Sequence, residues 1–341
     1  MNGYTPGEQP QDKTYIKLNT NENPYPPAPA IANHLTQFCA ETLRLYPDPV
    51  ANKLRTEAAK QIGKNKDWIL CGNGSDDLLT IALRTFVDEG GNIAFPVPTY
   101  SLYPVLAKIQ GATFTEVNLT YDFQLPENFL EQVRGSALLF LARPNAPTGN
   151  TFPVNTIEHI CAEFNGIVWI DEAYADFAAD NCLPLVEKFP NVVVSRSFSK
   201  SYSLAGLRLG LAFAQPALIE QMLKVKDSYN IDTITQQLGL IALQNRDWME
   251  HNRQRIIETR EHIASEMTKR NCEVIPSESN FIFLKPPIPA RKYFEQLREN
   301  GILVRYFPGE LTGNYVRITI GHDQDMEKLL HITDEIFANN A

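Results

Sequence analysis

Short apolar runs alternate with amphipathic stretches between about residue 50 and residue 215. Helical patterns such as Asp76–Val87 and Val154–Phe164 separate several of the runs. The run Ala137–Ala142 has no polar residue, which is typical of a strand covered on both faces. This alternation predicts an α/β fold, in which a mostly parallel mixed sheet is flanked by helices. The predicted strands are Trp68–Cys71, Asn92–Phe95, Thr113–Val117, Ala137–Ala142, Ile167–Asp171, Val192–Ser195 and Leu209–Phe213.

The pattern changes after Gln215, where helical periodicity begins and continues to about Arg270. Beyond it, three predicted strands and two predicted helices form a smaller α+β domain. Residues 1–30 are rich in Pro, Asn and Gly and predict an extended arm rather than a packed element. We therefore divide the chain into an arm that is also part of the small domain (1–45), a large domain (46–270) and a small C-terminal domain (271–341). The C-terminal elements are Phe281–Leu284, Ile302–Phe307, Tyr315–Ile320, Arg291–Asn300 and Asp325–Asn339.

Charge and composition narrow the partners of this chain. A formal net charge of -9 disfavours nonspecific binding to nucleic acid and to anionic membranes. No apolar run is long enough to span a bilayer, and the N-terminus lacks the apolar core of a signal peptide. The five cysteines are scattered and the six histidines form no ligand-spaced cluster, which argues against disulfides and a metal site. We expect a cytoplasmic protein with neither nucleic acid nor a membrane as a partner.

A lysine lies between hydroxyl groups in the segment Ser197-Phe198-Ser199-Lys200, directly after a predicted strand, and Arg208 follows. A nearby cation and a dry pocket favour the neutral, nucleophilic amine. Serine hydroxyls and an arginine together also suit a phosphate group. The alternative is an exposed loop lysine without a function.

A second candidate group ends the buried strand Ile167–Asp171. Open α/β sheets bind their ligands at the carboxyl ends of their strands. An aspartate there can keep a pyridine nitrogen protonated, as pyridoxal phosphate (PLP) chemistry requires, and Tyr174 could reach an oxygen of the same ring. The alternative is that Asp171 only caps a helix.

Three further turns follow predicted strands. The glycine-rich stretch Gly72–Asp77 leads into a helix and predicts a phosphate cradle of backbone N–H groups, although it lacks the Walker lysine. Tyr100, in Pro98-Thr99-Tyr100, could stack on a flat ring. The proline-rich turn Arg143–Gly149 is rigid enough to hold the polar side chain of Asn145 beside a ligand. Each turn taken alone is also compatible with an ordinary connection.

These motifs in this order resemble the fold-type I, aspartate-aminotransferase-like family of PLP enzymes. Three segments are similar to its histidinol-phosphate aminotransferase branch, namely Asn19–Pro26, Tyr46–Pro49 and Tyr315–Gly321. The resemblance implies that the large domain binds PLP and that Lys200 carries it covalently and moves the substrate proton. It also implies that Asp171 pairs with the ring nitrogen. The other implied cofactor contacts are Tyr174 on the phenolic oxygen, Tyr100 on the ring face, and Ser75, Asp76, Ser197, Ser199 and Arg208 on the phosphate.

The resemblance further implies a homodimer with shared active sites, in which Tyr46 reaches the cofactor phosphate of the partner subunit. Asn23 and Tyr25 would close over the substrate, and Arg305 and Arg317 would bind its anionic end. One position departs from the family. Ala146 stands where the family has an asparagine, so either Asn145 reaches the phenolic oxygen or Tyr174 contacts it alone.

The implied reaction moves an amino group between glutamate/2-oxoglutarate and histidinol phosphate/imidazole-acetol phosphate, a step of histidine biosynthesis. Other small amino and keto substrates stay open, because a threonine-phosphate decarboxylase or an aromatic amino acid aminotransferase would share the fold. No motif settles which bond at the substrate α-carbon is broken. A PLP-binding regulatory module and a nucleotide-binding protein that uses the glycine-rich loop are the alternatives outside this enzyme class.

Overall fold

The computed structural model describes residues 3, 7–11 and 15–340, and its centre is a sheet of seven strands. The strand order is β2-β8-β7-β6-β5-β3-β4. The strand β8 runs in the opposite direction to the six other strands of this sheet. The predicted mostly parallel mixed sheet is therefore confirmed. The strands are β2 (Ile69–Gly72), β3 (Asn92–Val97), β4 (Thr113–Asn118), β5 (Leu138–Ala142), β6 (Ile167–Asp171), β7 (Val192–Ser197) and β8 (Gly210–Ala214).

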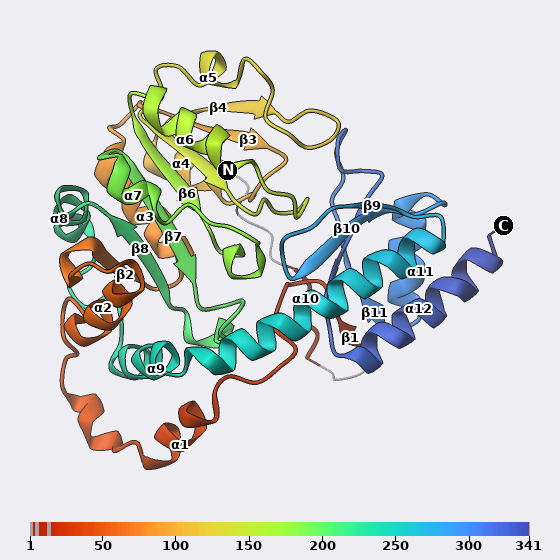
Figure 1. The fold of residues 1–341 in the computed structure, drawn as a ribbon, viewed down its shortest axis with the longest axis horizontal. Coiled ribbons are helices and arrows are strands. Elements are labelled where there is room, and N and C mark those ends of the chain that lie inside the picture. The colour runs from red at the N-terminus through yellow and green to blue at the C-terminus, as the bar shows by residue number, and fades with distance from the viewer. Residues whose placement is uncertain (1–2, 4–6, 12–14, 341) are drawn as a thin grey trace.

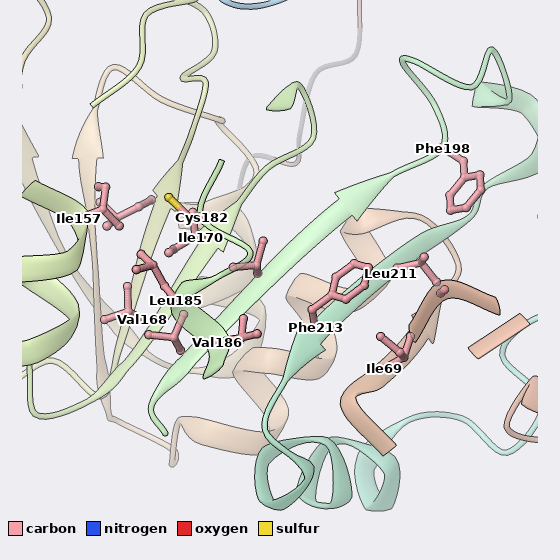
Figure 2. Close-up of a cluster of buried hydrophobic side chains, with 14 of the residues drawn as sticks. Ile69, Ile157, Val168, Ile170, Cys182, Leu185, Val186, Phe198, Leu211 and Phe213 are labelled. Carbon is pink, nitrogen blue, oxygen red and sulfur yellow. The ribbon is translucent and has the colours of Figure 1, made fainter. Parts of the chain in front are cut away.

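Helices cover both faces of this sheet, which explains the continuous apolar strands. Alternate residues of a strand point to opposite faces. Leu138 and Phe140 of β5 pack on one side, with α3 (Ser75–Phe86), α4 (Tyr103–Gln110) and α8 (Pro216–Val225). Leu139 and Leu141 pack on the other side, part of which is drawn in Figure 2. The helices of that side are α2 (Asn52–Ala59), α6 (Val154–Glu163), α7 (Leu185–Lys188) and α9 (Thr233–Gln244), while α5 (Phe129–Gln132) lies nearby in the same cluster.

The C-terminal part of the chain forms a second, antiparallel sheet of four strands in the order β12-β13-β10-β9. The long helix α10 (Arg246–Lys269) runs from the large domain across this smaller unit (Figure 1). Its Ile256, Ile263 and Met267 belong to the same buried cluster as the small-domain strands. The elements are β9 (Glu273–Ile275), β10 (Phe281–Lys285), α11 (Ala290–Glu299), β12 (Arg305–Tyr306), β13 (Val316–Thr319) and α12 (Asp323–Ala338).

Two predictions about these outer segments are wrong. The single strand predicted at Ile302–Phe307 is two short strands, because β11 (Ile302–Leu303) pairs with β1 (Ile16–Lys17) while β12 pairs with β13. The N-terminal arm is extended but packed. Leu18, Asn21 and Tyr25 are all at least 95% buried. A segment without hydrophobic periodicity gains this burial from tertiary contacts that local patterns do not encode.

The next segment lies at the periphery of the large domain in Figure 1, where Ile31 is buried in the core cluster and His34 contacts Gln237 of α9. It comprises α1 (Pro29–Gln37) and a 3-10 helix at Ala40–Arg44. The apolar side chains of Leu43, Leu45 and Tyr46 are exposed there. Within the part of the chain that the structure describes, no helix is both long and apolar enough to cross a membrane.

Candidate active site

The carboxyl ends of the central strands bring the predicted residues to one edge of the sheet. Asp171 ends β6, and its register neighbours are Ala142 on β5 and Ser195 on β7. Lys200 lies in the turn after β7. The glycine-rich turn follows β2, whose Gly72 pairs with Gly210 at the start of β8. This convergence is what parallel strand ends impose, and it makes the edge a candidate active site.

Asp171 is a buried carboxylate, and none of its hydrogen-bond partners among the described residues is a cation. The Tyr103 hydroxyl donates to Oδ2 at 3.1 Å, and the Ser195 hydroxyl donates to Oδ1 at 3.3 Å. Burial raises the pKa of Asp171 to about 6, and the charge of Asp76 adds to this, while the hydrogen bonds oppose it. A carboxylate in this setting is suited to pairing with a cationic N–H group. Sequence analysis did not identify Tyr103 as part of the site.

The Lys200 amine lies between the N-terminal arm and Tyr174, which is three residues beyond the end of β6. Its Nζ is 5.5 Å from the ring centroid of Tyr174 and 3.4 Å from the carbonyl oxygen of Thr20. Asn23 donates through Nδ2 to the carbonyl oxygens of Lys200 and Ser201, at 2.9 and 3.1 Å. The arm therefore lies directly against the lysine turn, where a group bound to the amine would sit.

A candidate anion cradle lies beside this turn, at the N-terminus of α3. Arg208 donates to the Ser199 hydroxyl at 3.3 Å and to the Asp76 carboxylate at 3.2 Å. The Ser199 N–H in turn donates to the Ser197 hydroxyl at 3.2 Å. The N–H groups of the first turn of α3, including those of Ser75 and Asp76, have no intrahelical acceptor, and the helix dipole favours an anion there.

Glycines make this cradle possible. Gly74 has a φ of 82°, and a Cβ at that position would lie 2.5 Å from the Arg208 guanidinium. A Cβ on Gly210 would lie 2.9 Å from the backbone nitrogen of Ser75. Both positions therefore need glycine, because any side chain would push the arginine or β8 away from the helix N-terminus.

The turns after β3 and β5 are tied to each other. Asn145 is fully buried, and its Nδ2 donates to the Pro98 carbonyl at 2.9 Å and to the Thr148 hydroxyl at 2.7 Å. Its Oδ1 accepts from the Thr99 hydroxyl at 2.9 Å. Tyr100 donates to Asp76 Oδ1 at 3.0 Å, which brings it to the cradle. The amide of Asn145 is thus engaged in holding the turns that carry Tyr100.

Two arginines face each other in the small domain. Arg305 on β12 and Arg317 on β13 are direct cross-strand partners. Arg317 donates to the carbonyl oxygen of Asn19 at 3.0 Å, and its guanidinium lies over the rings of Phe281 and Phe307. Two guanidinium groups that face each other in this way are suited to binding an anionic group.

Two of the residues predicted from the sequence lie apart from the strand-end site. Tyr25 packs in the core cluster of the small domain, with the Arg255 guanidinium 3.8 Å from its ring centroid and the His322 ring at 5.1 Å. Tyr46 is 82% exposed and stacks on Tyr229, with ring centroids 4.5 Å apart. A single chain therefore does not bring Tyr25 or Tyr46 to the lysine turn. Asn21 was not identified from the sequence, yet its Nδ2 donates to the Tyr174 hydroxyl at 2.8 Å.

A cavity of about 600 Å³ is lined by Arg196, Phe198 and Tyr202, but neither Lys200 nor Asp171 borders it. Arg196 is paired with the carboxylates of Glu172 and Asp176. Because the cavity borders neither the candidate amine nor the buried aspartate, we do not assign the site there. The strand-end site is the better candidate.

Comparison with known proteins identifies the family of this chain. The family model described as "Aminotransferase class I and II" matches residues 13–332. The chain belongs to this family. A histidinol-phosphate aminotransferase of Microcystis aeruginosa is 46% identical over 338 residues, which is 99% of this chain and 96% of that protein. One of Rippkaea orientalis is 44% identical, over 99% of this chain and 97% of that protein.

Solved structures show that this aminotransferase has the predicted fold. The histidinol-phosphate aminotransferase of Sinorhizobium meliloti, solved in complex with pyridoxal-5'-phosphate, superimposes with a TM-score of 0.88 and is 24% identical. The match covers 95% of this chain and 91% of that one. The aspartate aminotransferase of Thermotoga maritima gives a TM-score of 0.83 at 20% identity, over 95% of this chain and 92% of that one. The fold-type I prediction is confirmed.

Proposed function

We propose that this aminotransferase uses PLP to move an amino group between glutamate/2-oxoglutarate and histidinol phosphate/imidazole-acetol phosphate. The observation that carries the proposal is the sequence identity of 46%, over 99% of the chain, to a histidinol-phosphate aminotransferase. Family membership supports amino transfer over a regulatory module or a nucleotide-binding protein. Among the substrates considered, a phosphate-bearing amine agrees best with the facing arginines of the small domain.

The described residues fit PLP at each of its polar groups. The cradle of Ser75, Asp76, Ser197, Ser199 and Arg208 offers N–H, hydroxyl and guanidinium donors to a phosphate. The buried Asp171 lacks a cation, which a protonated pyridine nitrogen supplies. Lys200 would offer its amine to the aldehyde, and Tyr100 lies beside the cradle, where it could stack on the ring. Since Asn145 is engaged within the turns, Tyr174 is the residue that we assign to the phenolic oxygen.

Bound PLP would supply a carbon that accepts the amino group and a ring that withdraws electrons from the substrate α-carbon. The residues of the chain do the rest. Lys200, released from covalent attachment, would act as general base at that α-carbon and as general acid at the carbon that accepts the amino group. Asp171 keeps the proton on the ring nitrogen, and Tyr174 donates to the phenolic oxygen. Arg305 and Arg317 orient the anionic end of the substrate, while Asn23 holds the arm against the lysine turn.

Absorbance of the PLP-loaded enzyme tests the substrate. We expect histidinol phosphate to convert the cofactor rapidly to its amino form, with loss of the band near the visible edge. Threonine phosphate and phenylalanine should give far slower conversion, and threonine phosphate should release no CO2. Fast conversion by phenylalanine, or CO2 release from threonine phosphate, would replace the proposed substrate by that alternative. Glutamate serves as the positive control for the shared half-reaction.

We further propose that the active enzyme is a homodimer whose sites are shared. The segment that carries Leu43, Leu45 and Tyr46 exposes apolar side chains, as expected of a surface that a second copy covers. Tyr46 stacks on Tyr229, and the next residue, Asn230, donates to Asp77 in the first turn of α3. Tyr46 thus lies close to the cradle edge without entering it, in a position to serve the neighbouring subunit. The proposed compartment is the cytoplasm, in keeping with five unpaired cysteines.

Tyr46→Phe is expected to weaken PLP binding about tenfold or more, since a hydrogen bond to a charged group contributes about 1.5–3 kcal/mol. The decisive measurement is the activity of Tyr46→Phe after its subunits have been mixed with those of Lys200→Ala at limiting PLP. A mixed dimer has one site with both native residues, so activity should return above the sum of the two variants. Tyr121→Phe, at another exposed tyrosine, is the control and should bind PLP normally. Absence of recovery, or a monomer in sedimentation, would contradict the shared site.

A further inference from the structure

Asn21 joins three parts of the molecule at one buried point. It lies in the arm with 1% of its surface exposed and a φ of 55°, a left-handed conformation that asparagine tolerates better than most residues. Its Nδ2 donates to the Tyr174 hydroxyl of the large domain at 2.8 Å. Its backbone and Oδ1 bond to the small domain, through Thr319 and Asn280. The residue is therefore a bridge between the two domains.

The hydrogen bonds fix which way the Asn21 amide points. The Thr319 hydroxyl accepts from the Asn21 backbone N–H at 3.0 Å, so its own hydrogen is free to be donated to Oδ1, also at 3.0 Å. With Oδ1 held by a donor, the Nδ2 hydrogens face Tyr174. The Asn280 side chain donates to the Asn21 carbonyl at 3.0 Å and completes the set. All four polar groups of Asn21 are thus bonded.

The direction of this contact decides what the Tyr174 hydroxyl can do. A phenol has one hydrogen to donate. Because the Tyr174 oxygen accepts from Asn21, that hydrogen is left for another acceptor. An oxygen or carboxylate at position 21 would instead capture it. Asn21 therefore determines the donor role that we assign to Tyr174.

The same bridge reaches the substrate-binding strand. Thr319 lies two residues after Arg317 on β13, so both side chains share one face of the strand. Arg317 also donates to the carbonyl of Asn19, two residues before Asn21. A movement of β13 on binding an anion would therefore reach the Tyr174 hydroxyl through two hydrogen bonds.

We propose that Asn21 is a positioning residue that directs the Tyr174 hydrogen to the phenolic oxygen of PLP and links that contact to the position of β13. This inference rests on the proposed function for the identity of the cofactor. It adds Asn21 to the residues that act on the cofactor. It also adds a coupling between the anion site of the small domain and the electron distribution in the cofactor ring. The donated hydrogen bond stabilises the deprotonated phenolic oxygen, so its loss raises the pKa at which the bound cofactor changes its absorbance.

The test is a pH titration of the absorbance of the PLP-loaded protein, with PLP affinity of the cofactor-free protein as a second readout. Asn21→Asp keeps the size and the Oδ1 acceptor but removes the donor. We expect it to raise the spectral pKa by about one unit, a tenfold change in the proton equilibrium, as Tyr174→Phe does. The double variant should show no additional rise, because both changes remove one contact. Asn252→Asp, at a buried asparagine whose Nδ2 donates to the carbonyl oxygen of Pro26 instead, is the matched control and should leave the spectral pKa unchanged.

Thr319→Val gives a second route if Asn21→Asp does not fold. It removes the hydroxyl that orients the amide, and we expect a smaller rise of the spectral pKa in the same direction. The inference would be overturned if Tyr174→Phe raised the spectral pKa while the Asn21 or Thr319 variant left it unchanged. Additive shifts of the spectral pKa in the double variant would overturn it as well. No shift in Tyr174→Phe would overturn it too, together with the role given to that tyrosine. A wrong substrate assignment would give a different result. The variants would still shift the spectral pKa as expected, but histidinol phosphate would not convert the cofactor to its amino form.

Discussion

Replacement of Lys200 by alanine is expected to lower amino transfer by about 10⁴-fold or more and to abolish the absorbance band of covalently bound PLP. General acid–base catalysis alone contributes about 10²–10⁴-fold, and this variant also loses the covalent attachment. The measurement is the rate of the half-reaction with histidinol phosphate, together with the absorbance spectrum. Noncovalent PLP should still bind, because the cradle around Arg208 is untouched.

Two further variants make the result specific. Lys200→Arg keeps a cation near Tyr174 but cannot act as the nucleophile, and it should be as inactive as the alanine variant. Lys188→Ala removes an exposed lysine that pairs with Glu158 and should retain full activity. A Lys200→Ala protein that keeps the band would show that another amine carries the cofactor, and the assignment of the site would be wrong.

The residues that sequence analysis found share one property. Lys200, Asp171 and the Gly72–Asp77 loop each lie at the end of a buried strand or within a few residues of it, and a strand is recognisable from its own apolar run. Because parallel strands align their carboxyl ends, the position of each group in space followed from its position in the chain. Arg208 was found in the same way, since it follows the lysine turn and precedes β8.

The residues that it missed depend on contacts between distant segments. Tyr103 begins α4 and reaches Asp171 across 68 positions of the chain, and Asn21 reaches Thr319 across 298. Nothing local distinguishes Tyr103 from its neighbour Tyr100, and only the packing of α4 on the sheet turns its hydroxyl to the carboxylate. Tyr25 illustrates the converse. A family motif placed it over the substrate, but its ring fills the small-domain core beside Arg255.

Replacement of Asp171 by asparagine should change both activity and the pH dependence of stability. In the loaded enzyme the amide cannot hold a proton on the ring nitrogen, and we expect amino transfer to fall at least about 100-fold. In the cofactor-free protein, by contrast, the same replacement should increase the free energy of unfolding at neutral pH. Burial raises the pKa of Asp171 from 3.8 to about 6, so the folded state binds this proton more tightly than the unfolded state does.

The charged carboxylate consequently destabilises the cofactor-free protein. The free energy of unfolding should fall as the pH rises from about 4 to about 6, and the full cost applies above that range. A shift of about two units corresponds to about 3 kcal/mol. The free energy of unfolding of cofactor-free Asp171→Asn, taken relative to the native sequence, should therefore increase by about this amount between pH 4 and pH 7. Denaturant unfolding at both pH values measures it.

PLP should reverse this relation. A cation beside Asp171 favours the charged carboxylate and lowers its pKa, so the cost of burial disappears in the loaded protein. The native sequence should then gain more stability from saturating PLP at pH 7 than Asp171→Asn does, and the difference should shrink near pH 4. Equal gains for both proteins at pH 7 would show that Asp171 does not pair with the ring nitrogen. The same carboxylate that weakens the empty site would thus strengthen the binding of a protonated ring, and this gain would account for a buried carboxylate at the end of β6.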